Sequence, residues 1–241
     1  MANTYFRFKL FIVHQDQCAM KVCTDSCILG ALAAEYFRTA FSPAKKILDI
    51  GGGSGLLSLM LAQKIPAQIH AIEIDNASFL QMQQNFEASP WPSQLHAIQS
   101  DIKDFDNSHK YDFIISNPPF YENDLKGREA KRSRAMHDTG LTLFDLIIAL
   151  RTHLNDDGLF AVMLPYRRAE EFKNYIAEFH GRIHKEIQLR HHTEKEFFRS
   201  VFMGDLCSGS FSSEIKTFTI MENNSYSNEM KLLLKDYYLN F

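Results

Sequence analysis

The sequence predicts an α/β protein whose mostly parallel sheet carries helices on both faces. Short apolar segments alternate with segments of helical periodicity along most of the chain, which is the pattern of a parallel sheet joined by crossover helices. A glycine-rich turn, "GGGSG" at residues 51–55, directly follows one of these apolar segments. At 241 residues the chain is long enough to bury such a sheet, and one domain is predicted over residues 1–241.

Seven strands are predicted, in a Rossmann-like arrangement. The segments that favour strands are residues 45–51, 68–75, 94–101, 111–116, 158–165, 184–192 and 215–222. Helical patterns cover residues 56–63, 77–87, 143–154 and 168–179. A leader, residues 1–44, contains a further helix at 24–41 and precedes the core of the fold at 45–241. Residues 197–213 are rich in Phe, Gly and Ser and are predicted to form a loop.

Composition argues against a membrane protein and a secreted one. No apolar run approaches the ~20 residues that a membrane span needs. Arg7 and Lys9 interrupt the apolar N-terminal stretch, so no secretory signal is predicted. The four cysteines form no C-x-x-C pair, which favours reduced, packed thiols and no metal site. These features predict a cytoplasmic protein.

Candidate binding residues follow the first predicted strand. In open α/β sheets, ligands bind beyond the carboxyl ends of the strands. Here that end reads "LDIGGGSG", in which Asp49 precedes Gly51, Gly53 and Gly55. Glycines allow a sharp turn and close approach of a ligand. The spacing does not satisfy the G-x-G-x-x-G/A fingerprint of nicotinamide sites, and an acid at Asp49 suits an ammonium group better than a pyrophosphate.

The next two strand ends add residues suited to a nucleoside. Glu73 ends the second strand and is placed to accept hydrogen bonds from ribose hydroxyls. After the third strand, Asp101 can accept from an adenine amino group and Ile102 can pack on the ring. Capping of a turn is the alternative role for Asp101. An ammonium, a ribose and an adenine without a phosphate are the parts of S-adenosylmethionine, which is the cofactor predicted.

Four motifs in order carry a resemblance to a known family. "LDIGGGSG", "AIEID", "SDIKDF" and "SNPPF" resemble those of the class I S-adenosylmethionine-dependent methyltransferases, over about residues 20–165. The resemblance implies the class I methyltransferase fold, S-adenosylmethionine as cofactor and methyl transfer as the activity. The "NPPF" segment is similar to the signature of the branch that methylates exocyclic nitrogens of bases or the glutamine side-chain amide.

The leader resembles one part of this branch more closely. Residues 18–33, "CAMKVCTDSCILGALA", are similar to a "MKV-x-TD-x-x-LLGA" segment of the bacterial tRNA1(Val) (adenine(37)-N6)-methyltransferases. In that family the segment helps to close over the methionine part of the cofactor. The resemblance therefore implies Thr24 and Asp25 as cofactor-binding residues. Cys27 and Ile28 depart mildly from the family pattern.

The catalytic residues predicted are Asn117, Pro118 and Phe120. An exocyclic amino group is a poor nucleophile because its lone pair is delocalised into the ring. The Asn117 side-chain oxygen and the Pro118 carbonyl, fixed by two prolines, can accept its two hydrogens and direct the lone pair at the methyl group. Phe120 offers a ring on which the base can stack. Asn117 is also expected to contact the cofactor, and positioning rather than a strong base is expected to supply the catalysis.

A basic run follows the catalytic motif, although the net charge of the chain is −3. Its sequence from residue 126 to 134 is "KGREAKRSR". A local basic patch beside a site favours nucleic acid as the substrate, while a solvated loop is the alternative. The RNA-binding residues predicted are Lys126, Arg128, Lys131, Arg132 and Arg134.

Three functions follow from these observations. The first is methylation of the N6 amino group of an adenine in tRNA, at position 37 of valine tRNA, with tRNA as the partner. The second is a ribosomal RNA adenine methyltransferase or a release-factor glutamine amide methyltransferase. The leader is shorter than the helical N-terminal domain usual in the release-factor enzymes. The third, of another class, is a non-catalytic RNA-binding subunit, which would have no need of intact Asp49, Glu73, Asn117 and Phe120.

Overall fold

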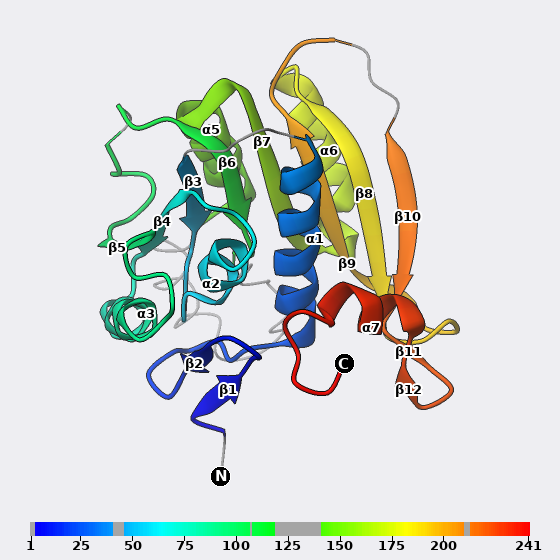
Figure 1. The fold of residues 1–241 in the computed structure, drawn as a ribbon. Coiled ribbons are helices and arrows are strands. Elements are labelled where there is room, and N and C mark those ends of the chain that lie inside the picture. The colour runs from blue at the N-terminus through cyan, green and yellow to red at the C-terminus, as the bar shows by residue number, and fades with distance from the viewer. Residues whose placement is uncertain (1–2, 41–45, 107, 119–140, 210–212) are drawn as a thin grey trace, which may run out of the picture.

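An eight-stranded sheet forms the centre of the computed structural model, which describes residues 3–40, 46–106, 108–118, 141–209 and 213–241 (Figure 1). Its strand order is β10-β8-β9-β7-β6-β3-β4-β5. In chain order the strands are β3 (Lys46–Ile50), β4 (Gln68–Glu73), β5 (Leu95–Gln99), β6 (Tyr111–Ser116), β7 (Leu154–Pro165), β8 (Arg182–Arg190), β9 (Phe197–Asp205) and β10 (Glu214–Thr219). Only β9 runs antiparallel to its neighbours in this sheet. The α/β class with a mostly parallel sheet is confirmed.

The predicted count of seven strands is wrong because residues 197–213 do not form one long loop. The first nine of them form β9, which lies between β7 and β8. Glycine favours turns, but here a glycine is needed inside a strand. A Cβ on Gly204 would lie 2.0 Å from the Arg182 carbonyl oxygen of β8. Ser200 is likewise buried and donates a hydrogen bond to Glu186. The residues that indicated a loop therefore serve close strand packing.

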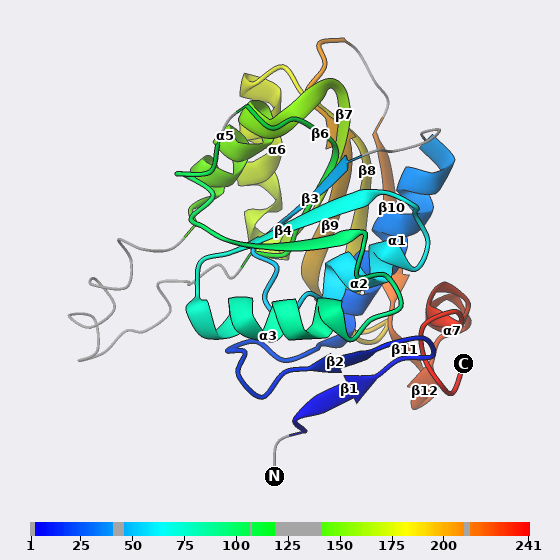
Figure 2. The ribbon, with the colours of Figure 1, turned by 60° about the vertical axis from the view of Figure 1, so that its left-hand side comes forward.

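Helices cover both faces of the sheet. On one face lie α1 (Thr24–Ala40), α2 (Leu56–Ala62), α3 (Asn76–Glu87) and α7 (Asn228–Leu234), and on the other lie α5 (Leu143–His153) and α6 (Ala169–Glu178) (Figures 1 and 2). A 3-10 turn, η1 (Tyr166–Arg168), precedes α6. Two small hairpins complete the described fold: β1 (Tyr5–Arg7) with β2 (Ile12–His14), and β11 (Met221–Glu222) with β12 (Ser225–Tyr226). The leader helix predicted at 24–41 is thus confirmed as α1.

Alternation along the central strands explains how one sheet serves two cores. In β3, Ile47 packs in the layer of α1 and α2, whereas Leu48 packs in the layer of α5 and α6. In β6, Phe113 and Ile114 divide in the same way. Strands that are buried on both faces consist of continuous apolar residues. These strands could therefore be predicted from the sequence.

Register places the polar strand ends side by side. Ile50, the last residue of β3, pairs with Ile72 in β4 and with Ser116 in β6. The glycine turn after β3, the acid that ends β4 and the Asn-Pro segment after β6 therefore meet at one edge of the sheet. Among the described helices, none is long and apolar enough to cross a membrane.

Candidate active site

A cavity of about 280 Å³ opens at the carboxyl ends of β3, β4, β5 and β6. It is lined from four strand ends and from the leader segment that precedes α1. Of the residues predicted from the sequence, the lining includes Gly51, Gly53, Glu73, Asp101, Ile102, Asn117 and Pro118. The fold thus brings the motifs at these separate strand ends together around one cavity.

The glycine turn depends on a backbone shape that side chains disfavour. Gly51, Gly53 and Gly55 have φ angles of 76°, 55° and 81°, all in the left-handed region. A Cβ on Gly51 or Gly53 would meet nothing within 4 Å, and both residues line the cavity. A Cβ on Gly55 would instead lie 2.5 Å from the Phe86 ring. The first two glycines therefore form an open cradle that side chains would fill, and the third is needed for packing.

Glu73 fixes this turn with its carboxylate. One oxygen, Oε2, accepts a hydrogen bond from the Gly53 amide at 2.8 Å, and the other, Oε1, accepts from the Asp75 amide at 2.9 Å. Each carboxylate oxygen can accept more than one hydrogen bond. Glu73 also lines the cavity. It can therefore hold the turn and still accept hydrogen bonds from ribose hydroxyls.

Asp49 lies one layer beneath the cavity. Its side chain is fully buried, and Ser58 Oγ donates to its Oδ2 at 2.7 Å. No hydrogen bond from the described residues reaches its Oδ1. The pKa of this carboxyl is raised to about 7, chiefly by burial and in smaller part by the negative charge of Glu73, while hydrogen bonds from Ser58 oppose the shift. A buried acceptor without a partner fits a nearby cation, although Asp49 itself does not line the cavity.

Asp101 caps a turn and also borders the cavity, while its contact with adenine stays a prediction. It lines the cavity, yet its Oδ1 accepts from the Lys103 amide at 3.0 Å and its Oδ2 lies 3.4 Å from the Lys103 ammonium. The carboxylate therefore caps a turn while it borders the hollow. Its neighbour Ile102 presents an apolar surface there. Asp75 accepts from the Ser78 amide and caps α3.

The leader reaches the cavity through the first residues of the family-like segment 18–33, ahead of the two residues predicted from it. Thr24 and Asp25, predicted as cofactor-binding residues, start α1 but are absent from the cavity lining, and Asp25 accepts from Arg199 Nε of β9 at 3.1 Å. The residues that line it instead are Cys18, Ala19 and Met20. The only signal that could have found them is Met20, which opens the family-like leader motif.

Asn117 and Pro118 lie where β6 ends and both line the cavity. Ser116, one residue earlier, donates from Oγ to the Ile50 carbonyl at 2.8 Å and ties this end to β3. The Asn117 amide nitrogen donates to Ser26 Oγ at 2.8 Å. Phe120 and the five predicted RNA-binding residues, Lys126, Arg128, Lys131, Arg132 and Arg134, lie outside the described residues.

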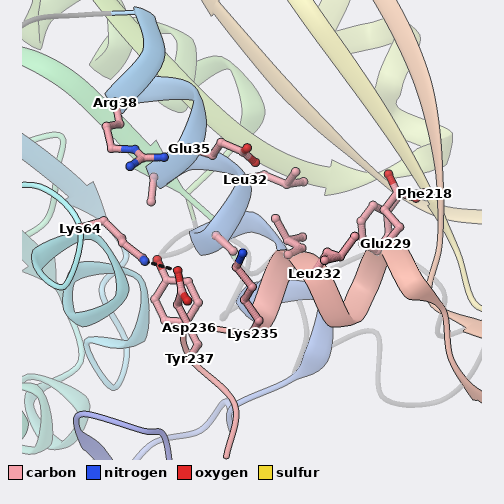
Figure 3. A pocket seen from close by; sticks show the side chains of 13 residues that line it. Leu32, Glu35, Arg38, Lys64, Phe218, Glu229, Leu232, Lys235, Asp236 and Tyr237 are labelled. Carbon is pink, nitrogen blue, oxygen red and sulfur yellow. Dashed lines mark hydrogen bonds and ion pairs between the residues drawn. The ribbon is translucent and has the colours of Figure 1, made fainter. Parts of the chain in front are cut away.

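A second cavity, of about 600 Å³, lies between α1 and α7 (Figure 3). Its lining carries both signs of charge, and the Lys64 ammonium faces the Asp236 carboxylate at 2.5 Å. It shares no lining residue with the first cavity and contains none of the residues predicted for the site. The chemistry predicted from the motifs therefore belongs to the first cavity.

Comparison with known proteins decides the family. Residues 29–161 match the family described as "Methyltransferase small domain". The chain belongs to this family. It is a class I methyltransferase, and S-adenosylmethionine is its methyl donor. The cavity fits this cofactor by its open glycine cradle, its carboxylate at Glu73 and the buried acceptor of Asp49 beneath it.

Relatives that align with nearly the whole chain are also methyltransferases by name. Two relatives are both named tRNA1(Val) (adenine(37)-N6)-methyltransferase. That from Dyadobacter fermentans is 36% identical over 99% of this chain and 99% of its own length. That from Photorhabdus laumondii is 37% identical over 97% of this chain and 95% of its own length.

The fold is shared with methyltransferases of much lower identity. A crystal structure titled a predicted O-methyltransferase, from Agrobacterium tumefaciens, gives a TM-score of 0.63 at 12% identity and covers 90% of this chain and 99% of its own. A type I restriction-modification methyltransferase subunit from Streptococcus thermophilus gives 0.60 at 14% identity, over 90% of this chain and 52% of its own. These likenesses support the class I fold.

Replacement of Glu73 by alanine is expected to weaken S-adenosylmethionine binding by ~1.5–3 kcal/mol, because a charged hydrogen bond to ribose and the support of the Gly53 amide are both removed. Calorimetry on the folded variant measures this. The control is Glu87→Ala, which removes an exposed carboxylate from α3. Wild-type affinity in Glu73→Ala would remove this residue from the cofactor site.

Binding of the cofactor is expected to depend on pH through Asp49. The pKa of about 7 in the free protein should fall when the cationic cofactor binds, so binding should release protons near neutral pH and strengthen as pH rises through 7. Calorimetry in buffers of different ionisation enthalpy counts the protons. Asp49→Asn should abolish the release. Equal proton release by wild type and this variant would exclude Asp49 as the group that titrates.

Proposed function

We propose that this protein transfers the methyl group of S-adenosylmethionine to the N6 amino group of an adenine in tRNA, at position 37 of valine tRNA. The observation that carries the proposal is the placement of Asn117 and Pro118 in the lining of the same cavity as the glycine turn and Glu73. This combination puts hydrogen-bond acceptors for an amino group beside the binding site of a methyl donor. Support for the substrate comes from the relatives that bear this name over nearly the whole chain.

The chain's own residues favour a substrate with two amino hydrogens. Asn117 offers its side-chain oxygen as an acceptor. Pro118 offers its backbone carbonyl oxygen, which can only accept hydrogen bonds. Two acceptors that hold the two hydrogens of an exocyclic amino group direct its lone pair out of the ring plane. The bound cofactor supplies an activated methyl group, so the protein needs to position the nitrogen and needs no strong base.

An RNA base must leave its stack before it can enter the cavity. Bases in an anticodon loop are partly unstacked, which lowers this cost. We expect Phe120 to stack on the extruded base and to contribute ~1–3 kcal/mol. Because tRNA is a cytoplasmic substrate in bacteria, the same proposal places the enzyme in the cytoplasm.

The other candidates from the same fold remain distinguishable by substrate. A ribosomal RNA or release-factor enzyme would use the same acceptors, since an amide nitrogen also carries two hydrogens. The relatives favour tRNA over both. A non-catalytic subunit is disfavoured because the buried acid, the glycine turn and the Asn-Pro pair are all present together.

Methyl transfer from labelled cofactor to an unmodified valine tRNA transcript tests the proposal. The expected product is N6-methyladenosine at position 37. A transcript with guanine at position 37 is the control and should take up no label.

Replacement of Asn117 by alanine should leave cofactor affinity largely intact and lower turnover by about two orders of magnitude, the scale for one positioned polar group. Equal labelling of both transcripts, or wild-type turnover in Asn117→Ala, would contradict the proposal.

The basic run is expected to bind the tRNA backbone. Replacement of Lys131, Arg132 and Arg134 by alanine should raise the Michaelis constant for tRNA and leave cofactor affinity unchanged. The salt dependence of tRNA binding should flatten by about one unit of slope for each phosphate group that the variant no longer binds. Binding titrations across a salt series measure the slope. An unchanged slope would place the RNA-binding surface elsewhere, with residues 182–199 as the next candidate.

A further inference from the structure

The first turn of α1 contacts the predicted catalytic amide directly. Asn117 Nδ2 donates to Ser26 Oγ at 2.8 Å, across 91 positions of sequence. Ser26 is only 7% exposed, and Cys23 Sγ lies 2.9 Å from the same oxygen. The three side chains thus form a short hydrogen-bonded chain that ends at the active-site cavity. Neither Ser26 nor Cys23 lines the cavity itself.

In this contact the nitrogen of the Asn117 side-chain amide faces Ser26, which leaves the oxygen for a substrate. A side-chain amide has one acceptor end and one donor end. With Nδ2 bonded to Ser26, the oxygen end remains, and no hydrogen bond from the described residues reaches Oδ1. An amide turned by 180° would present its NH2 group to the substrate's amino group, so two donors would face each other. Only the observed orientation provides an acceptor.

The turn that carries Ser26 is held from several sides. Asp25 accepts from the Ser26 amide at 3.1 Å and from Arg199 Nε of β9 at 3.1 Å. The Val22 amide donates to the buried Gln15 side chain at 2.7 Å. Ser26 therefore occupies a fixed position relative to the sheet, which a positioning group requires.

Cys23 suits the hydroxyl of Ser26 to an accepting role. Burial raises the pKa of the Cys23 thiol to about 11, so the group stays neutral at physiological pH. The hydroxyl proton can point toward this sulfur, and an oxygen lone pair then faces Asn117. With the hydroxyl donating to Cys23, both hydrogen bonds of the chain run from Asn117 toward Cys23.

We propose that Ser26 is a positioning residue for methyl transfer, which keeps the Asn117 side-chain oxygen turned toward the substrate's amino group. The proposal rests on the proposed function, since only an amino-group substrate requires an acceptor at this point. Ser26 does not line the cavity and acts through Asn117.

Replacement of Ser26 by alanine is expected to lower kcat about tenfold, the effect of removing one hydrogen bond of ordinary strength. The Michaelis constants for cofactor and tRNA should stay within about twofold of the wild-type values, because Ser26 is buried and does not line the cavity. Ser26→Cys keeps a side chain of similar size with a weaker acceptor and should lose part of the activity. The control is Thr39→Ala, which removes a hydroxyl that, among the described residues, donates only to carbonyls of α1 near its far end.

A double-mutant cycle separates positioning from a merely structural role. In the Asn117→Asp background both side-chain oxygens are acceptors, so the orientation of the group no longer matters. Removal of the Ser26 hydroxyl should then cost less than about twofold in kcat. An equal tenfold decrease in both backgrounds would show that Ser26 supports the turn alone and would overturn the proposal.

A readout independent of activity completes the test. The side-chain NH2 of Asn117, followed by 15N NMR, should exchange with solvent at least severalfold faster in Ser26→Ala, while the amides of α1 keep their rates. Unchanged exchange would overturn the proposal even if Asn117→Asp has no turnover. Failure of the wild type to methylate any tRNA would instead refute the proposed function and leave this measurement valid.

Discussion

The hydrogen bond between the Gly53 amide and the Glu73 carboxylate is the contact on which the cofactor site depends. It joins the turn after β3 to the end of β4 at 2.8 Å. Three residues of that turn have positive φ angles, which only glycine adopts without strain. Because glycine can adopt many backbone conformations, ordering this turn costs conformational entropy. The hydrogen bond to the Glu73 carboxylate stabilises one of these conformations. The same group lines the cavity, so the support of the backbone and the predicted contact with ribose rest on one side chain.

The electrostatics of the site are consistent with a cationic nucleoside and with no phosphate. Asp49 is buried beneath the glycine turn with one oxygen lacking a described partner, and its pKa is raised to about 7. Glu73 adds a second negative charge, which is one reason that the proton on Asp49 is held so firmly. A positively charged ligand relieves both effects at once, because it favours ionised Asp49 and offsets the repulsion between the two acids. A dinucleotide phosphate would increase that repulsion.

Sequence alone predicted those parts of the site that lie at the ends of strands. Gly51, Glu73 and Asn117 each follow an apolar run, and parallel strands bring such ends to one edge whatever their detailed packing. Contacts that depend on the third dimension were not predictable. The bond between Ser26 and Asn117 spans 91 positions and has no local pattern. β9 was missed for a related reason, because Gly204 signals a turn unless the nearness of the Arg182 carbonyl is known.

The strand ends supply only one side of the site, and the leader supplies the other. Residues 18–20 line the cavity, while Ser26, a few residues later, accepts a hydrogen bond from the side-chain amide of Asn117. The intervening turn is itself fixed by Arg199, which belongs to β9 near the other end of the sequence. The position of the Asn117 amide, which is predicted to be catalytic, therefore depends on contacts drawn from residues 15 to 199. The glycine turn is thus held by a contact between β3 and β4, whereas the position of the Asn117 amide depends also on α1 and β9.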